Sequence, residues 1–363
     1  MKRTMNFNPG PAALPLPVLQ EVQAELLDFA GTGMSILEVS HRGKEYEKVH
    51  NETQALVREL LGVGESYKVI FLGGGASLQF SMLPQNFLPD GKVADYLVTG
   101  TWAKGALKEA KLLGKTNVAA TTEVDGKFTR IPKASECKFT DGAAYVHFTT
   151  NNTIFGTQFG NEQFPKVAAP LVSDMSSDFL SRVFDAKPFS MIYAGAQKNL
   201  GPAGVTMVIL RDDFLAKAKD GVPTMLSYKT HVEKNSLHNT PPCFAIYVVG
   251  KVLRWLKGQG GVAGMEKINK EKGALLYGTI DKHAGFYKAP VDKDSRSLMN
   301  IVFRLPSEEL EARFIDEAKK QGMIGLKGHR SVGGIRVSAY NAVGLDWIKA
   351  VTSFMDEFVK KNG

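Results

Sequence analysis

A lysine and an aspartate follow two apolar segments of the chain, and together they could carry out covalent chemistry. Lys198 comes just after the apolar residues 191–194 and is followed by the turn-forming pair Gly201-Pro202. Asp174 ends an earlier apolar run that begins near residue 168. Short apolar runs bounded by turn residues are typical of buried strands. We therefore expect an amine and a carboxylate at the ends of two strands.

This pair of groups fits the requirements of pyridoxal phosphate. A lysine amine can hold the cofactor aldehyde as a Schiff base, and a carboxylate can keep the pyridine nitrogen protonated so that the ring accepts electrons. The pair alone leaves a second interpretation open, in which Lys198 is a solvated loop residue and Asp174 caps a helix. Other segments of the sequence bear on the choice.

A glycine-rich segment, Gly73-Gly74-Gly75-Ala76-Ser77, follows the apolar run 68–72 and begins a helical pattern. Free backbone NH groups and the helix dipole at such a place favour a phosphate group. The segment lacks the Gly-Lys-Ser/Thr ending of a Walker A loop and is not a GxGxxG dinucleotide motif. Taken alone, the glycines also fit a turn of purely conformational origin.

An aromatic and a hydroxyl side chain stand after two other expected strands. Trp102 follows the run that ends at residue 98, and its indole could stack on a flat ring. Thr153 follows the run 144–148, and its hydroxyl could bond a ring substituent. Each residue alone is as well explained by core packing or by a turn.

Two basic clusters could bind an acidic substrate. His41 and Arg42 stand in one expected loop, and His329 and Arg330 stand in another, with Arg336 on the strand beyond it. Guanidinium groups match carboxylate and phosphate oxygens in a bidentate manner. The alternative for either cluster is a solvated basic face.

The order of the apolar segments predicts an α/β architecture. Segments with helical spacing separate many of the apolar runs, which is typical of a largely parallel sheet. After Pro241-Pro242 the pattern changes to long helices with short strands. We expect strands at 68–72, 93–98, 118–121, 144–148, 171–174, 191–194, 205–210, 300–305 and 335–339. We expect helices at 17–30, 44–61, 77–83, 103–113, 244–257, 264–280, 307–320 and 346–361.

The length and composition indicate a globular protein of about two domains. The chain has 363 residues, of which 44% are hydrophobic and 23% charged. We predict a large cofactor-binding domain, residues 16–258, and a small C-terminal domain, residues 259–363, with an N-terminal arm, residues 1–15, associated with the small domain. The glycine-rich segment 258–261 marks the predicted boundary.

The charge and cysteine content argue against several other classes of protein. The net charge is +8 and the isoelectric point is about 9.2, but the basic residues are dispersed among acidic ones. A nucleic-acid-binding protein would rest on this net charge alone, and we expect no nucleic-acid partner. Cys137 and Cys243 have no metal-type or disulfide spacing, and no HExxH motif is present, so we expect no metal. Without an apolar signal segment or a membrane-spanning run, the sequence predicts a cytoplasmic protein with no membrane partner.

Along essentially its whole length the sequence resembles the phosphoserine aminotransferase family, which are fold-type I, class-V pyridoxal 5′-phosphate enzymes. The resemblance rests on an ordered series of motifs: Asn6-Phe7-Asn8-Pro9-Gly10-Pro11, Glu38-Val39-Ser40-His41-Arg42-Gly43-Lys44, the glycine-rich segment, Gly100-Thr101-Trp102, Tyr193-Ala194-Gly195-Ala196-Gln197-Lys198-Asn199, Asn239-Thr240-Pro241-Pro242 and Lys327-Gly328-His329-Arg330. It implies a large domain with a mostly parallel seven-stranded sheet and a smaller C-terminal α+β domain.

The resemblance also implies roles for individual residues. Lys198 is the catalytic residue and binds the cofactor covalently, while Asp174 pairs with the pyridinium. The other expected cofactor contacts are stacking by Trp102, a bond from Thr153 to the ring oxygen, and phosphate contacts from Ala76, Ser77 and Gln197, with Asn239 and Thr240 supplied by the partner subunit. The expected substrate contacts are Arg336 for the α-carboxylate and His41, Arg42, His329 and Arg330 for the distal acidic group.

The activity that the resemblance implies is transfer of the amino group of L-glutamate to 3-phosphohydroxypyruvate. The products are O-phospho-L-serine and 2-oxoglutarate, in serine biosynthesis, and the enzyme is a homodimer with shared active sites. A side reaction on 4-phosphohydroxy-threonine in pyridoxine biosynthesis stays open. Some relatives have arginine at the position of Ser77, and its absence here leaves more of the substrate contact to Arg42, His329 and Arg330. Some have serine at the position of Pro9, so Pro9 is not an expected substrate contact. A related aminotransferase acting on alanine, serine or glyoxylate is the nearest alternative, and the basic clusters argue against it.

Overall fold

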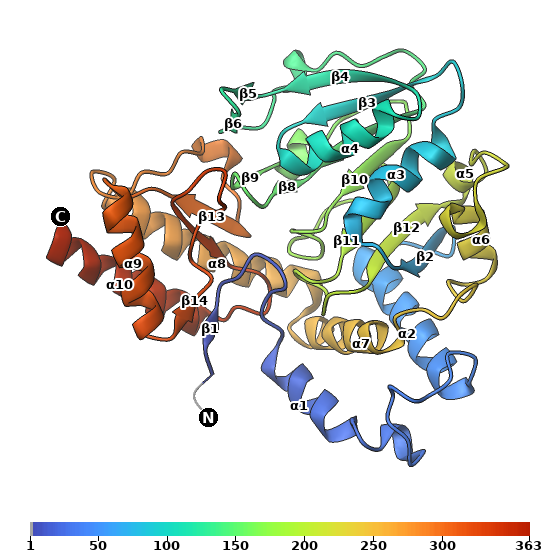
Figure 1. Ribbon diagram of the computed structural model, residues 1–363, viewed down its shortest axis with the longest axis horizontal. Coiled ribbons are helices and arrows are strands. Elements are labelled where there is room, and N and C mark those ends of the chain that lie inside the picture. Colours follow the sequence, from blue (N-terminus) through green and yellow to red (C-terminus); the bar gives the residue numbers. More distant parts are fainter. Residues whose placement is uncertain (1–2) are drawn as a thin grey trace.

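The computed structural model describes residues 3–363 and is built around a seven-stranded sheet (Figure 1). The strand order is β2-β12-β11-β10-β7-β3-β4, and within this sheet only β12 runs against the others. The strands are β2 (Tyr67–Leu72), β3 (Val93–Val98), β4 (Lys115–Thr121), β7 (Tyr145–Thr149), β10 (Leu171–Asp174), β11 (Phe189–Gly195) and β12 (Thr206–Arg211). The predicted mostly parallel seven-stranded sheet is thus confirmed.

Helices cover both faces of the sheet. Successive side chains of a strand point to opposite faces, so strands that are apolar throughout need helices on both sides. On β2, Val69 and Phe71 pack in one apolar cluster, and Ile70 and Leu72 pack in the other. The first cluster includes side chains of α1 (Leu16–Glu25), α2 (Lys44–Leu61) and α7 (Cys243–Gly258). The second includes side chains of α3 (Gly75–Phe87), α4 (Thr101–Lys111), α5 (Asp212–Leu215) and α6 (Tyr228–Glu233).

A third apolar cluster lies in the C-terminal part of the chain, to one side of the large sheet (Figure 1). It is built from α8 (Gly261–Lys282), β13 (Asn300–Phe303), α9 (Glu308–Lys320), β14 (Met323–Ile324), β15 (Ile335–Ser338) and α10 (Leu345–Asn362). β13 pairs with β15, and the N-terminal strand β1 (Met5–Asn6) pairs with β14. The first turns of α8, at Val262 and Met265, still pack with the first cluster. The domain limits proposed from the sequence stay a prediction.

Short elements join these parts. Two hairpins are formed by β5 (Glu123–Val124) with β6 (Lys127–Phe128) and by β8 (Asn151–Asn152) with β9 (Thr157–Gln158). Short 3₁₀ turns are η1 (Phe29–Gly31), η2 (Ala134–Glu136), η3 (Asn161–Gln163), η4 (Thr224–Leu226) and η5 (Lys293–Ser295). Cys137 and Cys243 are free thiols, as their spacing predicts. Within residues 3–363, no helix is both long and apolar enough to cross a bilayer.

The expected helix 17–30 is too long. α1 ends at Glu25, and Ala30 lies in a left-handed conformation with φ of 54° between two turns. Asp28, Gly31 and Gly33 explain this end, because the Asp28 carboxylate accepts the Gly33 NH at 2.8 Å and both glycines have positive φ. The apolar pattern of the sequence therefore extends beyond Glu25, although the turn residues that follow end the helix there.

Candidate active site

The candidate site lies at the edge of the sheet where the parallel strands end. β2 is antiparallel to β12, which is antiparallel to β11, so β2, β3, β7, β10 and β11 all finish at this edge. In open α/β sheets this edge is where ligands bind. The segments that follow these strands carry the glycine loop, Trp102, Thr153, Asp174 and Lys198. The topology thus gathers the residues that the sequence singled out.

Lys198 is half-buried and contacts two other predicted residues. Its Nζ donates a hydrogen bond of 2.9 Å to Thr153 Oγ1 and lies 5.9 Å from the centre of the Trp102 ring. The pKa of Lys198 is lowered to about 8, mainly by burial and to a smaller extent by Arg336, while Asp174 and Asp178 oppose the change. A lysine with such a pKa is a substantial fraction neutral near pH 8, as a nucleophilic amine must be.

Asp174 is a buried carboxylate at the end of β10. Its Oδ1 accepts the backbone NH of Ser176 at 2.9 Å. Burial raises the pKa of Asp174, while Lys198 and the bond from Ser176 lower it. The carboxylate is therefore in a low-dielectric position in which a cationic partner would stabilise its charged form.

Arg336 on β15 faces the same place from the C-terminal part of the chain. Its Nη1 donates to the backbone oxygen of Thr153 at 3.1 Å, so the guanidinium lies within the same group of residues as Lys198. The Arg336 Nε is buried and has no hydrogen-bond partner within residues 3–363. A buried donor without a partner is costly, and an anion bound here would satisfy it.

The glycine loop offers backbone donors at the start of α3. Gly74 and Gly75 have φ of 81° and 65°, and a Cβ at Gly73 or Gly75 would meet no atom within 4 Å. Ala76 is partly exposed and Ser77 is exposed, so the first turn of the helix faces open space. The arrangement provides the positive end of a helix dipole beside the sheet edge.

Gln197 and Trp102 also lie near the lysine, Gln197 as its neighbour in the chain and Trp102 through its ring. Gln197 is partly buried, its backbone oxygen accepts the Ala12 NH at 2.9 Å, and a Cβ at Gly195 would lie 2.7 Å from its Oε1. Trp102 is 38% exposed at the start of α4. A Cβ at Gly100 would lie 2.3 Å from Asn152 Oδ1, so glycine is required there for this approach of the two loops.

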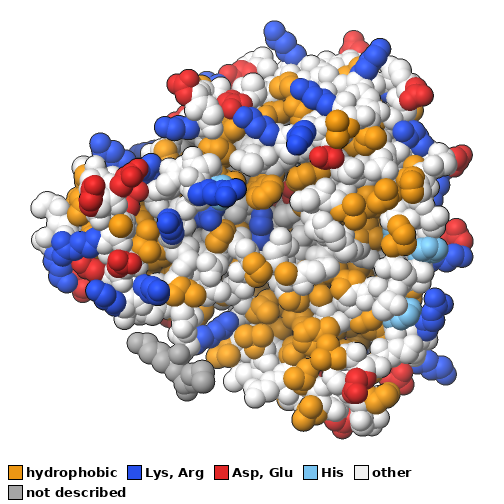
Figure 2. Space-filling view, in the orientation of Figure 1, with side chains coloured by type: hydrophobic (Ala, Val, Ile, Leu, Met, Phe, Trp, Pro, Cys, Tyr) orange, Lys and Arg blue, Asp and Glu red, His pale blue; other side chains and the backbone are white. Residues whose placement is uncertain are grey.

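Five basic residues line a cavity of about 590 Å³, and two of them are Lys319 and Lys327. Pro9, His329, Arg330 and Arg336 are among the residues that line it. His329 is half-buried, its Nδ1 lies 2.7 Å from Ser331 Oγ, and burial together with Arg336 and Arg330 lowers its pKa. In the space-filling view, Lys and Arg side chains face the hollow between the C-terminal lobe and the sheet (Figure 2).

Four predicted residues make no hydrogen bond to Lys198 within residues 3–363. His41 and Arg42 precede α2, and Asn239 and Thr240 precede α7. Arg42, Asn239 and Thr240 are exposed. Asn239 does line a cavity of about 250 Å³ with Gly73 and Gly74.

The sequence reading missed a polar network behind the lysine. Asp178 is buried and accepts hydrogen bonds from Thr150 Oγ1, from Gln158 Nε2 at 3.0 Å and from Arg182 Nη2 at 3.3 Å. Asn199 Oδ1 accepts the Asn341 NH at 3.0 Å, which ties the lysine loop to the C-terminal part of the chain. The run Asp174 to Asp178 signalled a second carboxylate, but nothing in the sequence paired Asn199 with Asn341.

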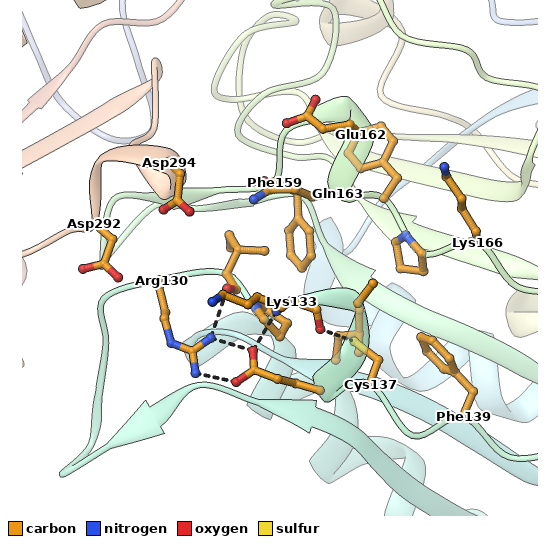
Figure 3. Close-up of a pocket in the computed structure, with 17 residues that line it drawn as sticks. Arg130, Lys133, Cys137, Phe139, Phe159, Glu162, Gln163, Lys166, Asp292 and Asp294 are labelled. Atoms are coloured by element: carbon orange, nitrogen blue, oxygen red, sulfur yellow. Dashed lines mark hydrogen bonds and ion pairs between the residues drawn. The ribbon is translucent and has the colours of Figure 1, made fainter.

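Another cavity, of about 820 Å³, lies away from this group of residues (Figure 3). Phe139, Phe159 and Phe164 are among the residues that line it, together with charged side chains such as Arg130 and Asp292. The Arg130 guanidinium there is already held by Glu136 through bonds of 2.7 and 2.8 Å. None of the predicted site residues lines this cavity.

The residues around Lys198 fit the chemical groups of pyridoxal 5′-phosphate. It contains an amine with a lowered pKa, a buried carboxylate, an aromatic ring and a glycine loop with open NH groups. The sheet topology and this combination of groups define an aminotransferase, and the sequence model of the aminotransferase class-V family matches residues 4–351. Class-V aminotransferases use pyridoxal 5′-phosphate.

Full-length relatives narrow the assignment within that class. The phosphoserine aminotransferase of Desulfosudis oleivorans is 58% identical, with 100% of this chain and 99% of the relative covered, and that of Geobacillus kaustophilus is 55% identical, with 99% of each covered. The solved structure of the Bacillus circulans subsp. alkalophilus phosphoserine aminotransferase matches with a TM-score of 0.97 and 53% identity over 100% of both chains. The chain belongs to the phosphoserine aminotransferase family.

Proposed function

We propose that this chain transfers the amino group of L-glutamate to 3-phosphohydroxypyruvate and so makes O-phospho-L-serine and 2-oxoglutarate for serine biosynthesis. Membership of the family supports the reaction. The single observation that carries the choice of an acidic substrate is the cavity that His329, Arg330 and Arg336 line together. A small neutral side chain would leave that positive charge without a partner.

Bound pyridoxal 5′-phosphate supplies an aldehyde that takes up the amino group and a ring that delocalises the electrons of a deprotonated substrate Cα. Lys198 would hold the cofactor through its Nζ. The same amine, when neutral, would take the proton from the substrate Cα and later return it. Its lowered pKa, about 8, favours the neutral form that this step needs.

The neighbours of Lys198 orient the cofactor. The Asp174 carboxylate would pair with the ring nitrogen and keep it protonated, because a buried carboxylate without a cation is unstable. Trp102 would stack on the ring. The Thr153 hydroxyl, which now accepts a hydrogen bond from Lys198 Nζ, would instead donate one to the ring oxygen of the cofactor. Ala76, Ser77 and Gln197 would hold the phosphate at the start of α3.

Basic side chains would bind the two acidic ends of the substrate. Arg336 has a buried Nε without a partner in the described chain, which suits the substrate α-carboxylate. His329 and Arg330, with His41 and Arg42, would bind the distal phosphate or carboxylate. The same pocket would thus accept both glutamate and phosphoserine, as a two-stage reaction through one site requires.

We further propose a cytoplasmic homodimer with shared active sites. Asn239 and Thr240 would contact the cofactor phosphate held by the partner subunit. Exposed apolar side chains around α1 support an interface there, and Figure 2 shows apolar surface over this region. They are Leu16, Leu19, Leu27, Met34 and Leu37. Surface of this kind marks protein contacts.

An amino-acceptor screen tests the proposed function. Purified holoenzyme would be supplied with L-glutamate and, in turn, 3-phosphohydroxypyruvate, pyruvate and glyoxylate, with 2-oxoglutarate formation as the readout. We expect catalytic efficiency to be greatest with 3-phosphohydroxypyruvate, by at least about a hundredfold. Greater efficiency with glyoxylate or pyruvate would overturn the assignment in favour of a small neutral acceptor. The same screen with the four-carbon keto acid that corresponds to 4-phosphohydroxy-threonine shows whether the side reaction of pyridoxine biosynthesis occurs.

A further inference from the structure

The loop of residues 327–334, which we call the basic loop, carries His329 and Arg330 and has little regular structure of its own. It is closed by a bond of 2.8 Å from the Gly328 NH to the Gly334 oxygen, and the His329 oxygen accepts the NH groups of Val332 and Gly333 at 3.0 and 2.8 Å. Arg330 is exposed. The positions of its two basic side chains therefore depend on what fixes the loop as a whole.

A buried carboxylate on α9 fixes one end of the basic loop. Glu311 is 6% exposed, and its Oε2 accepts the Gly334 NH at 3.1 Å. Its Oε1 accepts the Leu305 NH at 3.2 Å and Arg304 Nε at 2.5 Å. Three donors thus surround one carboxylate, which compensates for removing it from water.

The Arg304 guanidinium extends this contact along the loop. Its Nη1 donates to the backbone oxygen of Val332 at 3.0 Å. A Cβ at Gly334 would lie 2.6 Å from Arg304 Cδ, so the loop backbone rests directly on the arginine side chain. Val332 also packs against the apolar cluster that contains Phe128 and Phe155.

Neither Arg304 nor Glu311 has a part in the site described above. Neither lines the cavity of His329, Arg330 and Arg336. They contact each other and backbone groups, and Arg304 Nη2 also lies 3.9 Å from Glu308 Oε1. Arg304 directly follows β13, which pairs with β15, the strand of Arg336, so the pair links the basic loop to these two strands. The contacts of Arg304 and Glu311 are therefore with the backbone of the basic loop and not with the cavity.

We propose that Arg304 and Glu311 are positioning residues that set the basic loop and thereby the affinity for the distal acidic group of the substrate. The inference rests on the proposed role of His329 and Arg330 in binding that group. Removing either partner loosens the loop while Lys198, Asp174 and Arg336 keep their own contacts. The effect then falls on substrates with a distal acid and spares the chemistry at Cα.

The test compares Glu311→Gln with Glu317→Gln in the holoenzyme. Glu317 lies on the same helix and pairs with Arg313 at 2.7 Å on the exposed surface, so it is a matched control. We expect Glu311→Gln to raise the KM for phosphoserine and for glutamate by about tenfold or more, with kcat changed less than about threefold. The slow half-reaction with L-alanine, which has no distal acid, should keep its rate. The control should match wild type with all three substrates.

Two further variants keep the test decisive. Arg304→Lys retains the charge but not the fork that reaches both Glu311 and Val332, and it should also raise both KM values. Gly334→Ala disturbs the same contact from the loop side and replaces Glu311→Gln should that variant not fold. Unchanged KM values in these folded variants, or an equal loss with L-alanine, would overturn the positioning role. If wild type does not use phosphoserine but the variants weaken glutamate binding, the proposed function fails and the positioning role stands.

Discussion

At the scale of single residues, the lowered pKa of Lys198 gives a pH dependence. Only the neutral amine attacks an aldehyde, and the pKa of Lys198 in the free protein is about 8 because of burial and Arg336. We expect the rate at which apoprotein takes up pyridoxal 5′-phosphate to rise about tenfold per pH unit up to about pH 8 and then to level off. Stopped-flow absorbance between pH 6 and 10.5 measures it, using mutually overlapping buffers. A rate that keeps rising to the ordinary lysine value of 10.5 would show that the amine is not perturbed.

A second residue-scale prediction concerns Asp174. Asparagine keeps an oxygen for the Ser176 NH but carries no charge, so it cannot stabilise a cation next to it. We expect Asp174→Asn to fold with at least wild-type stability, because burial raises the pKa of the native carboxyl. Its kcat should fall by about a hundredfold or more. Steady-state kinetics with phosphoserine and a urea titration measure the two effects. A wild-type kcat would mean that another acid faces the cofactor nitrogen.

The residue scale also shows what the sequence could and could not reveal about the site. Lys198 and Asp174 could be singled out because Asp174 ends a strand with a clear apolar signal and Lys198 lies shortly after another such strand. The bond from Arg336 to the Thr153 oxygen joins residues far apart in the chain, and no local pattern records it. The partners of Asp178 are equally non-local. The roles assigned to these residues stay predictions until they are tested.

At the scale of elements, strands inside the sheet were predictable and short or polar elements were not. The predicted strand 118–121 is β4, which begins three residues earlier with Lys115, Thr116 and Asn117. These polar residues suit β4 because it forms an edge of the sheet, where one side faces solvent. The two-residue pair β1 with β14 and the short helix α6 left no periodic signal to read.

The helix α8 offers an element-scale prediction, because a buried lysine fastens it to the segment after β15. Lys272 Nζ donates to the backbone oxygens of Ala339, Tyr340 and Val343 at 2.9, 2.9 and 3.1 Å. Lys272→Met would leave these carbonyls without that donor. We expect the free energy of unfolding to fall by about 3 kcal/mol or more, since each unsatisfied group costs about 1 to 3 kcal/mol.

The control for this prediction lies two residues away on the same helix. Lys270 is exposed and pairs with Glu266 on the surface of the helix, so Lys270→Met should change the stability by less than about 1 kcal/mol. Urea unfolding of holoenzyme followed by circular dichroism compares the two variants. The segment held by Lys272 includes the neighbour of Asn341, which bonds Asn199 beside Lys198, so activity should be lost at a lower urea concentration as well. Equal stability of the two variants would show that water replaces the lysine.

At the scale of the whole molecule, two arrangements of Asn239 and Thr240 are compatible with the single chain: contact with the cofactor phosphate of their own subunit, or with that of the partner subunit. Asn239 and Thr240 are exposed, and in this chain Asn239 lines a cavity with Gly73 and Gly74 of its own glycine loop. A dimer could bring the same residues of the partner subunit to that loop. The two arrangements predict different behaviour of mixed dimers, which makes complementation the appropriate experiment.

Two defective variants can therefore report on shared sites. Lys198→Ala should be inactive because it lacks the reacting amine, and the double change of Asn239 and Thr240 to alanine should bind the cofactor weakly. In a mixed dimer with shared sites, one site combines an intact Lys198 with intact phosphate contacts from the other chain. Co-expression in equal amounts should then restore about a quarter of the wild-type activity, because half of the dimers are mixed and half of their sites are complete. Activity no greater than that of the double variant alone would place the phosphate contacts within one chain, and dilution below the dimer dissociation constant would then leave cofactor binding unchanged.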